Sequence, residues 1–212
     1  PIEENPALDE ALEKIADYSW LVFTSPTGVR IFRDYLKKHS IDNRKLSHLK
    51  FAVIGQGTAE KMREWGFSPD LMPEVYDSRH LAEELALQVG KNEKILLPRA
   101  RMGSRELTEI LERAGIQTAD IPLYDTCYES RPFVDLEKEF GEGISDYAVF
   151  TSASTVRGFV HAAPDLDFGR VTAPCIGEKT EEEARKAGMV TYTARRADIE
   201  SLVLLAEEME KQ

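Results

Sequence analysis

Short apolar runs alternate with amphipathic stretches along most of this chain. Residues 20–24 and 51–54 are such runs, rich in the aromatic and β-branched side chains that favour strands. Between them, Val29, Phe32 and Leu36 recur at the spacing of one helical face. Strands that alternate with helices of about 10–15 residues are typical of βαβ units, in which helices cover a parallel sheet. We therefore predict an α/β fold with parallel sheets flanked by helices.

Turn and cap residues mark where the predicted elements begin and end. Ser25 and Pro26 are typical of a helix N-cap and first position, and Gly66 and Gly115 of helix ends. The predicted strands are residues 20–24, 51–54, 70–72, 94–97, 117–121, 147–151, 173–176 and 190–193. The predicted helices are one opened by residues 25–26, one through residues 62–65, and residues 81–89, 107–114, 155–162, 180–187 and 199–209. Ser78 and Ser104 are expected N-caps, and Thr180 with Glu183 fits a capping box.

The chain repeats itself at the scale of a domain. The segment Phe23-Thr-Ser-Pro-Thr-Gly-Val-Arg-Ile-Phe32 resembles Phe150-Thr-Ser-Ala-Ser-Thr-Val-Arg-Gly-Phe159, and Ile54-Gly-Gln-Gly-Thr58 resembles Ile176-Gly-Glu-Lys-Thr180. The copies are offset by 127 and 122 residues, whereas a solenoid repeats about every 20–50 residues. The duplication therefore predicts two similar α/β lobes.

A stretch without helical periodicity separates the two copies. Residues 121–132 carry two prolines, and we interpret this region as an extended linker. We predict a complete lobe at residues 6–120, a linker at 121–130 and a second lobe at 131–212, with residues 1–5 as the remnant of a first linker. The second lobe has fewer predicted strands and is expected to be incomplete. Two lobes joined by extended linkers are expected to enclose a cleft.

Composition disfavours several classes of function. The net charge of −11, from 27 basic and 38 acidic residues, argues against nucleic-acid binding. No apolar run approaches the roughly 20 residues that span a bilayer, and the first residues do not resemble a secretion signal. Cys127 and Cys175 form no C-x-x-C pair, and no two of the four histidines have ligand spacing. We therefore expect a cytoplasmic protein with no metal site and no membrane partner.

A Thr-Ser pair follows a predicted strand in each copy. The pairs are Thr24-Ser25 and Thr151-Ser152, and each stands where a strand ends and a helix begins. In open α/β sheets, ligands bind at the carboxyl ends of strands, where hydroxyls and free N–H groups can hold carboxylates. Thr24, Ser25 and Ser152 are therefore candidate ligands for an anionic substrate. Ordinary helix capping is the alternative for each of them.

Glycine and threonine occupy a second pair of strand-to-helix turns. Gly57-Thr58 and Thr180 stand at corresponding positions of the two copies. The first turn is not G-x-G-x-x-G, because Glu60 lies three residues after Gly57, so dinucleotide binding is disfavoured. We predict that Gly57, Thr58 and Thr180 contact an anion, with plain helix capping as the alternative.

Arg99 and Tyr124 complete the set of candidate site residues. Arg99 follows a predicted strand and is a candidate anion clamp, although a solvated loop arginine is an equal alternative. Tyr124 lies in the predicted linker, and its phenol can donate a proton or a hydrogen bond. Packing within the linker is the alternative for Tyr124. No Ser-His or Cys-His nucleophile motif and no catalytic carboxylate pair is present in the sequence.

Six segments of the chain, taken in order, resemble one known family. They are residues 17–25, 52–59, 95–101, 123–126 (Leu-Tyr-Asp-Thr), 146–154 and 176–180. Their order and spacing are similar to those of uroporphyrinogen-III synthases, and the resemblance covers essentially the whole chain. Glu178 and Lys179 depart from the pattern, because a small residue or proline is more usual after that glycine.

The resemblance implies a reaction and a substrate. Members of the family close hydroxymethylbilane, a linear tetrapyrrole with eight carboxylates, into uroporphyrinogen III and invert the last pyrrole ring. It implies no cofactor, a monomeric protein and functional coupling to hydroxymethylbilane synthase. Tyr124 would be the acid that assists loss of the terminal hydroxyl. The resemblance also implies that a first βαβ segment, which would complete the second lobe, is absent from this chain.

Two other classes of function remain open. The chain could be a two-lobed protein that binds a tetrapyrrole or another anionic ligand without converting it. It could also be a receiver-like regulatory protein, although the sequence shows no clustered acidic pocket at strand ends.

Overall fold

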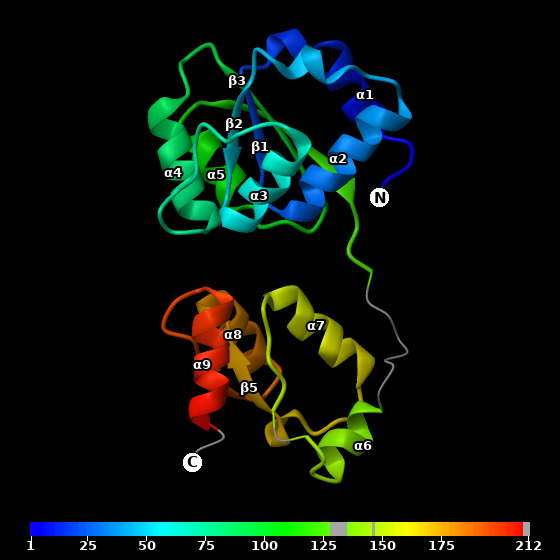
Figure 1. The fold of residues 1–212 in the computed structure, drawn as a ribbon, viewed down its shortest axis with the longest axis vertical. Helices are drawn as coiled ribbons and strands as arrows, with labels where there is room; N and C mark the ends of the chain where they lie inside the picture. The colour runs from blue at the N-terminus through cyan, green and yellow to red at the C-terminus, as the bar shows by residue number, and fades with distance from the viewer. Residues whose placement is uncertain (128–134, 146, 210–212) are drawn as a thin grey trace. The chain divides into compact units, whose positions relative to one another are not determined.

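The chain folds into two compact units. The computed structural model describes residues 1–127, 135–145 and 147–209 (Figure 1). Unit 1 is Pro1–Thr126 and unit 2 is Cys127–Gln212. Both combine parallel strands with helices, which confirms the predicted α/β class. Residues 128–130 of the predicted linker lie outside the described residues.

Unit 1 contains a four-stranded parallel sheet. Its strands are β1 (Trp20–Phe23), β2 (Lys50–Val53), β3 (Lys94–Ala100) and β4 (Gln117–Tyr124), in the spatial order β2-β1-β3-β4. Its helices are α1 (Pro6–Glu13), α2 (Pro26–Lys38), α3 (Gln56–Trp65), α4 (Ser78–Gln88) and α5 (Glu106–Arg113), with 3-10 turns at Ile15–Asp17 and Asn43–Leu46. Because the strands are parallel, their carboxyl ends all lie at the same end of the sheet. We call the residues that follow these four ends the carboxyl edge of unit 1.

Helices cover both faces of this sheet. Leu21 and Phe23 of β1 pack into a cluster formed with α1, α2 and α3. Trp20 and Val22 point to the other face and pack with α4 and α5. In Figure 1, α1 and α2 accordingly lie on one side of the strands and α4 and α5 on the other. This alternation of buried side chains explains why the strands read as continuous apolar runs.

The first residues of unit 1 are held against β4. The Ile2 N–H donates to the Leu123 carbonyl at 2.9 Å, and Asn5 Nδ2 donates to the Pro122 carbonyl at 2.7 Å. Asn5 Oδ1 also accepts the Leu8 N–H and so caps α1. The sequence analysis did not predict α1, although Asn5 followed by Pro6 is an N-cap signal.

Several predicted boundaries in unit 1 were wrong. Asp77, rather than Ser78, caps α4 and accepts the His80 N–H at 2.8 Å. β3 continues through Pro98, which lies beyond the residues that pair with β1. β4 continues to Tyr124, so the first part of the predicted linker belongs to the sheet. Residues 70–72 form only a single bridge, between Ala52 and Leu71.

Unit 2 has a smaller sheet. Its strands β5 (Thr172–Cys175) and β6 (Val190–Thr193) are parallel, and isolated bridges join Tyr147 to Thr172 and Phe150 to Cys175. The predicted strand at residues 147–151 is therefore present only as bridges. The helices are α6 (Leu136–Gly141), α7 (Ala153–Ala162), α8 (Glu178–Lys186) and α9 (Ile199–Met209), with a 3-10 turn at Phe168–Arg170. The capping box lies at Ser152 and Thr155, whereas Gly177 precedes α8 without a side-chain cap.

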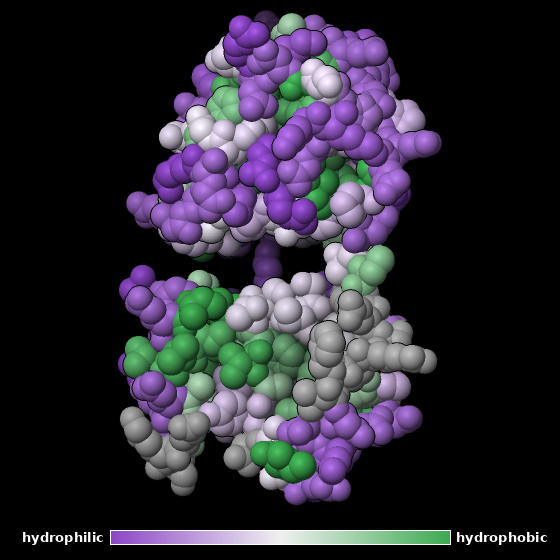
Figure 2. All heavy atoms as spheres, turned by 45° about the vertical axis from the view of Figure 1, so that its right-hand side comes forward, coloured by the Kyte–Doolittle hydropathy of each residue, from purple (hydrophilic) through white to green (hydrophobic). Residues whose placement is uncertain are grey.

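Unit 2 buries one described apolar cluster and leaves other apolar side chains exposed. The buried cluster contains Phe150, Val156 and Ala173. Figure 2 shows apolar side chains gathered on one face of this unit. The large apolar side chains of β6 and α9 that are about half exposed or more are Val190, Tyr192, Ile199, Val203 and Leu204.

Candidate functional site at the carboxyl edge of unit 1

Two predicted site residues meet at the carboxyl edge of unit 1. Ser25 Oγ and Tyr124 Oη lie 2.9 Å apart, in a hydrogen bond for which either oxygen can be the donor. Ser25 Oγ also accepts the Gly28 N–H at 3.0 Å and thereby caps α2. Both side chains are partly exposed. A phenol and a helix-capping hydroxyl therefore form one hydrogen-bonded group beside solvent.

An irregularity in the sheet places Tyr124. Arg99 pairs with Pro122, but the next residue, Ala100, pairs with Tyr124, so β4 gains one residue relative to β3. The Arg101 N–H then donates to the Tyr124 carbonyl at 2.9 Å. A bulge of this kind redirects the side chains that follow it. Tyr124 is thus the last residue of a strand held on its backbone, rather than a linker residue.

The start of α3 lies beside the start of α2. A side-chain carbon added at Gly57 would come within 3.7 Å of Pro26 Cγ. The predicted residues Thr24, Ser25 and Gly57 therefore lie near one another at the carboxyl edge. The Thr58 side chain is 2% exposed, so in this structure its hydroxyl offers little surface to a ligand. The Thr58 and Ala59 N–H groups already donate to the Gly55 carbonyl at 3.1 Å, so the donors of this turn without a described hydrogen bond are the Gln56 and Gly57 N–H groups.

Gly55 lies directly against an aromatic side chain of unit 1. A side-chain carbon at Gly55 would come within 3.0 Å of Tyr76 Cγ, so the group that approaches this backbone is an aromatic ring of the protein itself. Tyr76 was not singled out by the sequence, and no pattern around it indicates this contact.

Arg99 is occupied by partners within unit 1. Its Nε and Nη2 donate to the two carboxylate oxygens of Asp120 at 2.7 and 2.6 Å, and Nη1 donates to the Ser104 carbonyl. The Arg99 side chain is 7% exposed, whereas that of Asp120 is 39% exposed. This fork-to-carboxylate pair fixes the loop after β3. Because Arg99 is nearly buried and already bound to Asp120, it offers an anion little access, and Asp120 is a partner that the sequence analysis missed.

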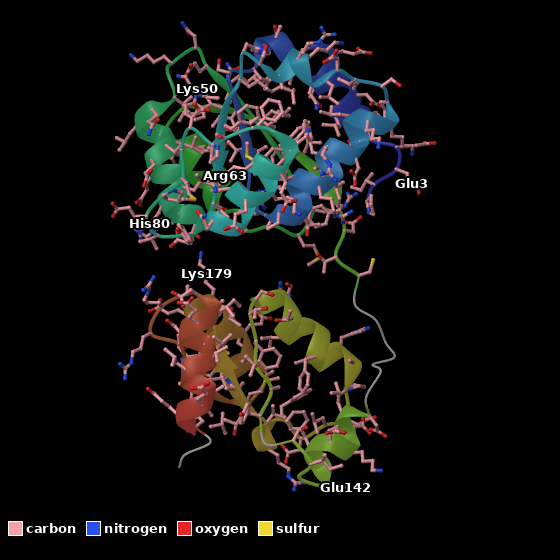
Figure 3. All side chains as sticks on the ribbon, viewed as in Figure 1. Glu3, Lys50, Arg63, His80, Glu142 and Lys179 are labelled. Carbon is pink, nitrogen blue, oxygen red and sulfur yellow. The ribbon has the colours of Figure 1, made fainter. Side chains whose placement is uncertain are left out.

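In unit 2, Ser152 and Thr180 occupy the positions that match Ser25 and Thr58. Ser152 Oγ accepts the Thr155 N–H at 3.2 Å and lies 3.0 Å from Ser154 Oγ. Thr180 is buried, as Thr58 is. Lys179 stands in the first turn of α8 (Figure 3). The predicted cleft concerns both units together and stays a prediction.

Lys50 lies away from this site. Lys50, the first residue of β2, and His80, in the first turn of α4, lie at opposite ends of the unit (Figure 3). Lys50 Nζ lies 3.7 Å from Glu93 Oε1 and 5.1 Å from the Trp20 ring centre, at the amino ends of the strands.

No three His, Cys, Asp or Glu side chains cluster as metal ligands within residues 1–127, 135–145 and 147–209. In the same ranges, no helix has the length and apolar character needed to cross a bilayer.

Comparison with known proteins identifies a family. The sequence model of uroporphyrinogen-III synthase HemD matches residues 1–204. The porphyrin biosynthesis protein HemD of Ruminiclostridium josui is 38% identical over 203 residues, which are 96% of this chain and 40% of that protein. The uroporphyrinogen-III synthase of Synechococcus elongatus is 26% identical over 216 residues, which are 97% of this chain and 80% of that protein. The chain thus spans two-fifths of the length of the first relative.

Two solved structures share the fold. A mutant uroporphyrinogen III synthase from Thermus thermophilus is 17% identical with a TM-score of 0.65, covering 99% of this chain and 86% of that one. The uroporphyrinogen-III synthetase of Helicobacter pylori is 20% identical with a TM-score of 0.66, covering 99% of this chain and 87% of that one. At these identities the likeness establishes a shared architecture.

Proposed function

Because this chain belongs to the uroporphyrinogen-III synthase family, we propose that it closes hydroxymethylbilane into uroporphyrinogen III and inverts the last pyrrole ring. Uncatalysed closure gives the symmetric isomer instead. The protein has to hold one chain conformation and assist one bond cleavage, which are tasks of positioning and proton transfer.

We propose that Tyr124 is the acid in the first step. The Tyr124 hydroxyl passes its proton to the terminal hydroxyl of the substrate as the carbon–oxygen bond breaks. The bonding electron pair leaves with the oxygen, which departs as water. Electrons of the pyrrole ring form the new double bond of an azafulvenium cation, and a phenolate remains on Tyr124. The observation that carries this assignment is the 2.9 Å contact between Tyr124 Oη and Ser25 Oγ, which holds the phenol at the carboxyl edge of unit 1.

We propose that dipoles, more than side-chain cations, hold the substrate carboxylates. The net charge of −11 gives no general attraction for an anion, and Arg99 is already paired with Asp120. Thr24 and the backbone at Gly57 lie where α2 and α3 begin, beside the N-cap Ser25, and helix N-termini carry partial positive charge. Ser152 and Thr180 stand at the corresponding positions of unit 2. Binding that relies on such donors should weaken less with salt than binding to a lysine-lined surface.

The remaining expectations concern the setting of the reaction. We propose that the protein is a cytoplasmic monomer that works without a cofactor. We also propose that it receives hydroxymethylbilane from hydroxymethylbilane synthase, because this linear product closes by itself to the symmetric isomer.

A coupled assay tests the proposed function. Hydroxymethylbilane synthase generates the substrate in the presence of the full-length protein, and chromatography separates the two ring isomers after oxidation. We expect an excess of the type III isomer that grows with protein concentration. An isomer ratio equal to that without the protein, combined with measurable binding of the tetrapyrrole, would instead support the alternative of a ligand-binding protein without catalysis.

A further inference from the structure

We infer that Ser25 is a positioning residue for Tyr124, which it orients and polarises so that the phenol proton points away from the protein. This inference rests on the proposed function, because it assigns a role within that reaction. Ser25 was first selected as a direct ligand of the substrate. Its hydrogen bonds give it a different role.

The Ser25 hydroxyl has two partners within unit 1. A hydroxyl offers one hydrogen and two acceptor positions. The Gly28 N–H, at 3.0 Å, takes one acceptor position, and Tyr124 Oη stands 2.9 Å away. If Tyr124 donated to Ser25, its proton would point into the protein and could not reach a substrate. Only the opposite direction, with Ser25 donating, leaves the phenol hydrogen free for delivery.

The cap on α2 favours that direction. An oxygen that accepts a hydrogen bond becomes a better donor through its own hydrogen, so the Gly28 N–H strengthens the Ser25 bond to Tyr124. The first turn of α2, a helix of 13 residues, adds a partial positive charge beside the same oxygens. Both effects stabilise the phenolate that remains after proton transfer. The relay is thus Gly28 N–H to Ser25 Oγ–H to Tyr124 Oη–H.

The repeat in unit 2 shows what makes this arrangement specific to unit 1. Ser152 matches Ser25, but Thr155 stands where unit 1 has Gly28. The Thr155 hydroxyl donates to the Ser152 carbonyl at 2.6 Å, and Ser154 Oγ lies 3.0 Å from Ser152 Oγ. In unit 1, a side-chain carbon at Gly28 would lie 3.3 Å from Ser25 Oγ and crowd it. Glycine therefore leaves the serine hydroxyl accessible to tyrosine.

Four variants of the full-length protein test the inference in the coupled assay. They are Ser25→Ala, Ser25→Thr, Tyr124→Phe and the double variant Ser25→Ala with Tyr124→Phe. We expect Ser25→Ala to lower kcat about tenfold and to change KM less than about twofold, because the lost interaction stabilises the transition state. Ser25→Thr keeps a capping hydroxyl and should recover most of kcat. In the Tyr124→Phe background, Ser25→Ala should have no further effect on kcat, because the group on which it acts is gone.

A matched control separates this role from loss of a helix cap. Asp42 caps the 3-10 turn Asn43–Leu46 and accepts the Arg44 N–H at 2.8 Å, just before β2 and so toward the amino ends of the strands. Asp42→Ala should lower the melting temperature as Ser25→Ala does while leaving kcat unchanged. Effects of Ser25→Ala and Tyr124→Phe that multiply, or a rise in KM with unchanged kcat, would overturn the inference and restore Ser25 as a substrate ligand. A wild-type protein that yields no excess of the type III isomer would instead defeat the proposed function, and the inference with it.

Discussion

The two units contain the same strand-to-helix turn but use it differently. In unit 1 the capping serine shares its hydroxyl with a tyrosine from the last strand of the sheet, 99 residues away. In unit 2 the matching serine bonds only within its own turn among the described contacts, to Ser154 and Thr155. The repeated sequence therefore fixes the backbone of the turn in both copies. The residues that surround each copy decide which chemistry the turn can support.

The same contrast appears in the two sheets. The unit 1 sheet has four strands with a buried cluster on each face. The sheet of unit 2, within the described residues, has two strands and neighbouring bridges, and apolar residues of β6 and α9 are exposed. Unit 1 should accordingly tolerate changes at its carboxyl edge without unfolding, which makes it the better place to separate catalytic from structural effects.

The strongest test of the comparison is Tyr124→Phe. The variant keeps the ring and removes the hydroxyl that has no described counterpart at the matching turn of unit 2. If the phenol supplies the proton, kcat should fall roughly 100-fold, near the lower end of what a general acid contributes, with little change in KM. The coupled assay measures both constants. Tyr192→Phe, at a half-exposed position in β6, is the matched control and should leave turnover unchanged.

A loss of only about tenfold would indicate that Tyr124 positions the substrate while water or a substrate carboxylate supplies the proton. Unchanged turnover with an unchanged isomer ratio would remove Tyr124 from the mechanism.

The reactivity of the two thiols should report the opening of unit 2. Burial raises the pKa of the Cys175 thiol to about 11, so it stays protonated near neutral pH, whereas Cys127 is exposed. Cys127 should react with an alkylating reagent at least roughly 30-fold faster, because labelling of Cys175 requires an opening that costs about 2 kcal/mol or more. Mass spectrometry of quenched samples measures both rates. Equal rates would show that the buried cluster of unit 2 opens freely.

Burial of the Cys175 thiol should also make the stability of unit 2 depend on pH in the alkaline range. The folded state keeps the Cys175 proton to higher pH than the unfolded chain, whose thiol has a pKa of about 9. The stabilisation is therefore complete below about pH 9 and is lost as the pH rises toward 11. Cys175→Ser, which removes this titration, should flatten the alkaline loss of unit 2 stability.

The ion pair of the buried Arg99 should stabilise the protein more than the partly exposed pair of Arg157 and Glu183 in unit 2. Asp120→Asn leaves the buried guanidinium with a weaker acceptor, and we expect a loss of about 1–2 kcal/mol in the free energy of unfolding, reduced by the partial exposure of Asp120. Glu183 pairs with Arg157 at 3.2 Å on the surface of unit 2, and Glu183→Gln should cost less than about 0.5 kcal/mol. Denaturant titrations of the two variants give these values. Equal losses in the free energy of unfolding would mean that burial of Arg99 does not strengthen its ion pair.

Replacing the glycine before α3 and the glycine before α8 with alanine should change stability by different amounts, and we expect this difference to be smaller than the one between the ion pairs. Gly55→Ala brings a carbon within 3.0 Å of the Tyr76 ring, and we expect a loss of about 1 kcal/mol as the ring shifts. The nearest atom at Gly177 is Ala197 Cβ at 3.7 Å, an ordinary contact, so Gly177→Ala should change stability by less than about 0.5 kcal/mol. Both backbones are extended at these positions, so conformation itself excludes neither alanine. A larger effect in unit 2, measured by the same denaturant titrations, would reverse the comparison.

The sequence predicted those elements whose signals are local. Helix α9 was predicted with its observed ends, and α3 ends at Gly66, which has a φ of 98°. Ser25 and Ser152, which were selected at strand-to-helix turns, are the N-caps of α2 and α7. The features that the sequence analysis missed depend on residues far away in the sequence. The extent of β4 depends on pairing with β3, and the ion pair of Arg99 depends on Asp120 in the neighbouring strand. The Ser25–Tyr124 contact joins residues whose types were informative but whose proximity no local pattern encodes.

The hydrogen bond between Ile2 and Leu123 has a mechanical consequence. The backbone enters and leaves unit 1 at two points that this 2.9 Å bond joins, and the bond from Asn5 to Pro122 lies beside it. A module whose two ends touch can be spliced into a surface loop of a host protein without straining either partner. A pulling force applied at those ends would act first on these two bonds, one after the other. The four-stranded sheet would carry the load only after both had opened.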